Sequence, residues 1–167
     1  YSLALIDIDE STTFSGSVDA TDINIAGSKT ATFNDAITAT TIALNGSSTL
    51  TISYTGAITV AGNITDTSTS NTINVLFATA DTAPALVTFS GAAVAADTIN
   101  IGSTTQAGKA TFTGSTGVTA TTLTVAGGNH ADEDSTATFN DDVTATIVLD
   151  DNLGDAKIIF AAANTAT

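Results

Sequence analysis

The chain contains no cysteine, methionine or tryptophan, and its 167 residues include a single proline. The absence of cysteine excludes disulfide bonds and thiolate chemistry. The absence of tryptophan removes the usual aromatic platform of a sugar-binding groove. This composition argues against a polysaccharide hydrolase.

Positive charge is also scarce, because 3 lysines and no arginine stand against 17 acidic residues, for a formal net charge of −14. Nucleic-acid backbones and anionic lipid surfaces repel such a chain, so we expect no nucleic-acid partner. No hydrophobic run approaches the roughly 18–20 residues that cross a bilayer, so we expect no membrane insertion. The opening YSLALIDIDE lacks a methionine and a basic segment, and we interpret it as part of a processed or longer chain.

Good helix formers are rare, whereas threonine, valine and isoleucine are abundant. Branching at Cβ stiffens these side chains and suits them to a pleated, extended backbone. The composition therefore predicts an all-β protein with a core of small aliphatic residues.

A phrase anchored on phenylalanine recurs along the chain. It reads FNDAITATTIAL at 33–44 and FNDDVTATIVL at 139–149. Further copies begin at Phe14, Phe89 and Phe112, a degenerate relative runs through Tyr54, and a partial copy begins at Lys157. Self-similarity near 20 residues is typical of stacked-repeat proteins.

The spacing of the apolar residues within one copy predicts where the backbone turns. Ile37 and Ala39 share one parity, whereas Ile42 and Leu44 have the other. Because side chains alternate with period two along a strand, the chain must bend or bulge near Thr40–Thr41 to bury both pairs.

Three short strands and three corners in about 20 residues describe one coil of a β-solenoid. We predict a β-solenoid (β-helix) of about seven irregular coils, in which Phe stacks over Phe and Val or Ile over Val or Ile. The alternative is an antiparallel β-sandwich, which explains the composition but not the repeated phrase. We expect residues 1–167 to form a single repeat-built domain, with an irregular coil or junction around 63–88 that includes Pro84.

Acidic residues cluster in two turn-like segments, DDNLGD at 150–155 and HADED at 130–134. Solvated acidic loops are the simpler interpretation. The alternative is Ca²⁺, which binds six to eight oxygens and matches the strongly negative charge. Its candidate ligands are Asp150, Asp151, Asp155, Asp132 and Asp134; we expect no required cofactor.

The sole histidine, His130, lies in a loop-like segment rich in acids. Without cysteine, a catalytic triad would need this residue as its base. We interpret it as a solvated loop residue, predict no catalytic residues, and expect the protein not to be an enzyme.

The phrase ATFTGSTGVTATTLTVAGG at 110–128 and its relatives resemble the repeats of β-solenoid surface proteins of the surface-layer, autotransporter-passenger and repeat-adhesin types. This resemblance implies an extracellular or cell-surface structural role, as a self-assembling subunit of a surface layer, sheath or filament. The partner is then the protein itself. We expect two end segments to pair between subunits, or to continue into chain beyond the given sequence. Their residues are Lys157, Ile158, Ile159 and Phe160 at one end, and Leu3, Leu5 and Ile6 at the other.

A second class of function is a binding module, either an adhesin or a phage-fibre segment. Such a module would present the loops at 63–72 and 128–135 from a solenoid stalk, with glycans as the partner. Concentration-dependent self-assembly separates the first class from the second.

Overall fold

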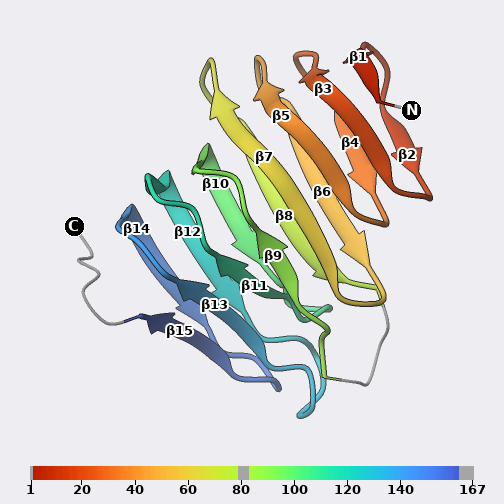
Figure 1. Cartoon of the computed structure of the whole chain (residues 1–167). Helices are drawn as coiled ribbons and strands as arrows, with labels where there is room; N and C mark the ends of the chain where they lie inside the picture. The colour runs from red at the N-terminus through yellow and green to blue at the C-terminus, as the bar shows by residue number, and fades with distance from the viewer. Residues whose placement is uncertain (1, 79–82, 162–167) are drawn as a thin grey trace.

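The computed structural model describes residues 2–78 and 83–161, which form a parallel β-solenoid of about six turns (Figure 1). Every ladder between its strands is parallel, which confirms the predicted solenoid and rejects the antiparallel sandwich. The turn count is slightly below the predicted seven coils. The fifteen strands are β1 (Leu3–Ile8), β2 (Thr12–Phe14), β3 (Val18–Ile25), β4 (Thr30–Phe33), β5 (Ile37–Leu44), β6 (Thr49–Tyr54), β7 (Ile58–Asp66), β8 (Thr72–Phe77), β9 (Val87–Phe89), β10 (Ala93–Ile101), β11 (Lys109–Phe112), β12 (Gly117–Ala126), β13 (Ser135–Phe139), β14 (Val143–Asp150) and β15 (Ala156–Phe160).

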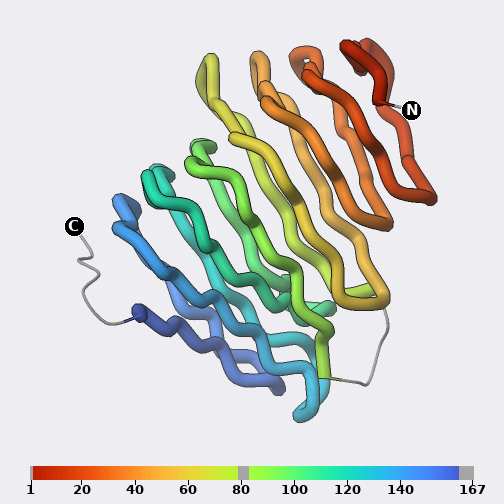
Figure 2. The backbone as a smooth tube through the Cα atoms, in the orientation of Figure 1, coloured from red at the N-terminus to blue at the C-terminus, as the bar shows by residue number. Residues whose placement is uncertain are grey.

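The bend predicted inside each copy is present. In β5, Ile37 is buried, Thr38 and Thr40 are exposed, and the buried parity then changes to Ile42 and Leu44. The pairing of β5 with β7 shifts register in the same place, between Thr38 and Thr41. The long strands therefore fold around a corner, so that each coil has three faces and follows the path traced in Figure 2.

Residues at equivalent positions of successive coils lie one above another in columns that point inward, and one column from each of the three faces illustrates this. Each of these columns contains seven residues, one from each of seven rungs, and the six steps between successive rungs correspond to about six turns. The Ile6 column is Ile6, Ile23, Ile42, Ile64, Val94, Val118 and Val143; the Phe14 column is Phe14, Phe33, Ile52, Val75, Ile101, Val125 and Leu149; the Val18 column is Val18, Ile37, Val60, Phe89, Phe112, Phe139 and Phe160.

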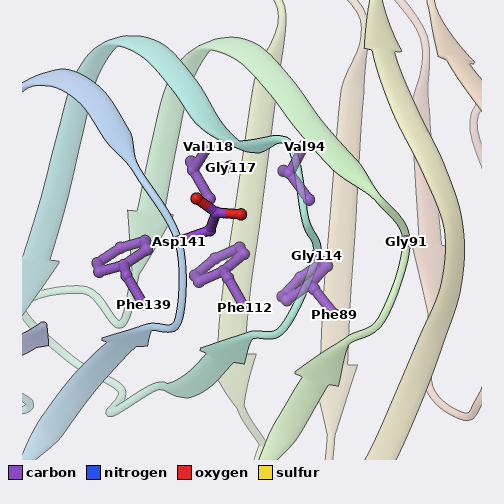
Figure 3. A pocket seen from close by; sticks show the side chains of 9 residues that line it. All are labelled: Phe89, Gly91, Val94, Phe112, Gly114, Gly117, Val118, Phe139 and Asp141. Atoms are coloured by element: carbon purple, nitrogen blue, oxygen red, sulfur yellow. The ribbon is translucent and has the colours of Figure 1, made fainter. Parts of the chain in front are cut away.

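Phenylalanine stacks on phenylalanine, but in two separate places. Phe14 and Phe33 stack in one column at 4.7 Å between ring centroids. In the Val18 column, Phe112 lies 4.8 Å from Phe89 and 5.0 Å from Phe139 with nearly parallel rings (Figure 3). The prediction that like side chains stack is thus right within each half of the chain, and wrong between Phe33 and Phe112, which occupy different faces.

The change of face has an identifiable cause in β8. This strand occupies the Phe14 face but has no counterpart in the recurring phrase. It adds one face to the path, so every later copy of the phrase begins one face further on. The change falls within the predicted irregular stretch 63–88, whose residues 79–82 lie outside the described structure.

The core is closed and almost entirely apolar. The buried residues form one cluster that runs through all coils, from Ile8 to Val143. A small gap beside the phenylalanine stack in Figure 3 leaves no room for a water molecule. Each rung shelters the one below from water, at roughly 25 cal/mol for each Å² of apolar surface removed.

Two buried polar side chains connect coils at the corners. The Asn71 carboxamide accepts hydrogen bonds from the Ser48 amide at 2.8 Å and donates to Asp66 at 2.6 Å and to the Leu44 carbonyl at 3.3 Å. The Tyr54 hydroxyl accepts from the Lys109 amide at 2.8 Å and donates to the Lys109 carbonyl at 3.3 Å. Burial raises the pKa of Tyr54 to about 12, although the hydrogen bond with the Lys109 backbone opposes this shift.

Candidate functional site: the two open ends

The N-terminal end of the solenoid is formed by β1 and β2. Each of these strands pairs with one neighbour, β3 or β4, and no described strand pairs with its other edge. The exposed fraction is 57% for Leu3 and 48% for Leu5, whereas Ile6 and Phe14 are half-buried against the core. This end therefore presents both unpaired backbone groups and apolar side chains.

The C-terminal end is formed by β14 and β15, at the opposite end of the stack (Figure 1). Leu149 ends the Phe14 column and is 53% exposed, and Phe160 ends the Val18 column and is 40% exposed. The Phe160 ring lies 5.9 Å from Phe139, so it continues the aromatic stack. Ile159 is also exposed, and Ile158 packs against the core.

Sequence reasoning named only part of this end. Val148, Leu149 and Leu153 are exposed large apolar residues that were not expected to take part in assembly. Their copy of the phrase reads like the others. The signal that identifies them is position, because this is the last full copy of the phrase and no later described strand pairs with β14.

The lysines of the two ends differ in their surroundings. Lys29 forms an ion pair of 3.1 Å with Glu10, between neighbouring coils at the N-terminal end. Lys157 is exposed and borders an open hollow of about 460 Å³ at the C-terminal end, together with Asp134, Asp151 and Asp155. Lys157 thus lies among carboxylates of its own chain.

Three of the five calcium-ligand candidates border this same hollow, while Asp132 and Asp150 do not. Asp134 accepts a hydrogen bond of 2.8 Å from the Asp155 amide, and Asp151 accepts one of 2.8 Å from the Ala156 amide. Within residues 2–78 and 83–161, no three acidic or histidine side chains form a group that could hold a metal ion. Calcium binding therefore stays a prediction.

His130 lies in an exposed turn, as expected, and its carbonyl accepts a hydrogen bond of 3.0 Å from the Glu133 amide. Glu133 itself is 1% exposed, in the loop that links β12 and β13. The loop predicted at 63–72 is shorter in the structure, because residues 63–66 belong to β7. The exposed part comprises residues 67–70.

The described part of the chain contains no helix that is long and apolar enough to cross a membrane. Comparison with protein-family models, curated proteins and solved structures finds no match to this chain.

Proposed function

We propose that this protein is an extracellular structural subunit that self-assembles through the ends of its solenoid into a surface layer, sheath or filament. The observation that carries the proposal is the pair of ends of the described stack, where strand edges that no described strand pairs coincide with exposed apolar side chains. Natural proteins usually cover or charge such edges, because an open edge recruits another strand.

The geometry of the ends favours an open polymer. The two ends are different surfaces, so a contact between them is heterologous, and a contact that does not close generates a fibre. Leu149 and Phe160 are both exposed and both end a column of the core. Covering them with another rung removes apolar surface from water, which is favourable.

The chemical composition supports an external location. The chain has no cysteine, few lysines and a net charge of −14, and its outward strand positions are rich in threonine. Strong negative charge keeps the long sides of such rods apart in solution, because like charges repel. Growth is then favoured along the axis, where the apolar rungs lie.

The test compares assembly of the natural chain with that of a variant whose C-terminal end is charged. We expect light scattering and electron microscopy to show concentration-dependent rods for the natural chain, and folded monomers for the variant Leu149→Lys, Phe160→Lys. The control Thr38→Lys, Thr119→Lys adds the same charge at exposed positions on the sides of the rod, and is expected to assemble.

Two outcomes contradict the proposal: a natural chain that stays monomeric at all concentrations, or a charged-end variant that assembles as well as the control. A monomer that binds cells or glycans would instead favour the adhesin or phage-fibre function. Repeating the experiment with Ca²⁺ and with a chelator tests the calcium prediction, because calcium-dependent growth is expected only if the acidic loops bind the ion.

A further inference from the structure

The first and the last rung of the described solenoid are both complete, so the two ends match each other face for face. Within residues 2–78 and 83–161 the Ile6, Phe14 and Val18 columns contain the same number of residues, so neither end of the described stack has a face that lacks its rung. The first rung consists of Ile6, Phe14 and Val18, and the last consists of Val143, Leu149 and Phe160. Both ends therefore present one complete three-faced layer.

The order of faces along the chain also agrees between the ends. Within each rung the chain passes the Ile6 face, then the Phe14 face, then the Val18 face. The last described strand, β15, lies on the Val18 face. The next face along this path is the Ile6 face, which is the face on which β1 begins. In a second copy placed on the C-terminal end, β1 therefore lies on the face that the winding of the first copy reaches next, so the order of the three faces continues unchanged from one copy into the other.

We infer that the C-terminal end binds the N-terminal end of a second copy of this chain in one defined register, with Ile6 on Val143, Phe14 on Leu149 and Val18 on Phe160. This inference rests on the proposed function and specifies its interface. In this arrangement β1 and β2 pair in parallel with β14, and the start of β3 pairs with β15. Each column then continues from one copy into the next with an apolar contact.

Charge favours this register over registers that are slipped by two residues. In the inferred register Asp7 lies opposite Thr144, so no acid faces an acid there. A slip by two residues in one direction places Asp7 opposite Asp142, and like charges directly opposite each other destabilise a strand pair. A slip by two in the other direction places Phe14 opposite Asp151. A slip by one turns every inward side chain outward.

The absence of native cysteine makes the register measurable by disulfide formation. Thr13 and Val148 are exposed, point outward from their strands, and face each other in the inferred register. Neighbouring strands lie about 4.8 Å apart, which suits the Cα separation of about 4.4–6.8 Å in disulfides. In the control pair, Thr13 with Thr146, a two-residue offset places the Cα atoms about 8 Å apart.

The experiment uses the full chain carrying Thr13→Cys with Val148→Cys, and the matched chain carrying Thr13→Cys with Thr146→Cys. After mild oxidation under assembly conditions, non-reducing electrophoresis is expected to show a shift from monomer to a ladder of covalent multimers for the first chain. The second chain is expected to remain mostly monomeric, and a chain with Thr13→Cys alone to give no ladder.

The remaining outcomes separate the register from the function on which it rests. If rods form but the ladder appears with the control pair, with both pairs equally, or with neither pair, the register is wrong while self-assembly stands. If scattering shows no rods and no ladder forms, both the register and the proposed function are overturned.

Discussion

Replacing Phe112 with alanine tests whether the stacked columns hold the solenoid together. Phe112 is 3% exposed and lies between the rings of Phe89 and Phe139 at 4.8 and 5.0 Å. A Phe→Ala change in a packed core costs about 3–5 kcal/mol, since it removes apolar contact and leaves a cavity. Two ring pairs, each worth about 0.5–1.5 kcal/mol, are lost as part of this cost.

The matched control is Phe14→Ala in the first rung. Phe14 stacks on one ring only, that of Phe33, and it is half-buried. We therefore expect a smaller cost of about 1–2 kcal/mol, from one ring pair and a partial loss of buried area. The comparison holds the chemistry constant and changes only the number of rungs that cover the ring.

The assay is urea unfolding followed by far-ultraviolet circular dichroism at a protein concentration where the chain is monomeric. Linear extrapolation gives the free energy of unfolding in water for each variant. A domain of this kind has about 5–15 kcal/mol in total, so Phe112→Ala is expected to fold but to unfold at much lower urea. Equal costs at the two positions, or less than about 1 kcal/mol at Phe112, would refute the stacked-core account.

Three further predictions concern the corners and the buried polar groups. Gly91→Ala is expected to lower the midpoint of thermal unfolding strongly, because an added Cβ at Gly91 meets the Gly62 carbonyl, whereas Gly16→Ala has open space and little effect. Asn71→Ala is expected to cost about 1–3 kcal/mol in the same urea assay, because it removes the side-chain oxygen that accepts from the buried Ser48 amide; an effect below about 0.5 kcal/mol contradicts this. The pKa of Tyr54 is raised in the folded state, so its contribution to the free energy of unfolding is fully present below pH 10. This contribution is lost as the pH rises from 10 towards 12, because Tyr54 then ionises more readily in the unfolded chain, and the loss amounts to about 2–3 kcal/mol in total. Unfolding curves between pH 9 and 12 test this, and Tyr54→Phe is expected to remove that part of the pH dependence.

The repeated phrase was sufficient to predict the fold, because its parity admits few backbone paths. The change from Ile37 and Ala39 to Ile42 and Leu44 requires a corner, and repetition of the corner requires coils. The face on which each copy falls could not be predicted, since Phe33 and Phe112 have similar neighbours in the sequence. Only the pairing of β8, which contains no copy of the phrase, shows that the second half is displaced by one face.

The candidate site was predicted in part for a related physical reason. Leu3, Leu5 and Phe160 were expected at the ends because their segments lie outside the full copies of the phrase. Leu149 was missed because its own copy is indistinguishable from copies inside the stack. Exposure of such a residue depends on whether another rung follows it, and this is a property of the assembled stack and not of the local sequence.

The extra strand β8 determines how the two ends of the solenoid are oriented relative to each other. Unequal recombination that duplicates or deletes a whole phrase adds or removes three faces, and leaves the orientation of one tip relative to the other unchanged. Loss of β8 alone would turn one tip by a third of a revolution relative to the other. The phenylalanines of the two halves would then fall on the same face of the solenoid instead of on two different faces.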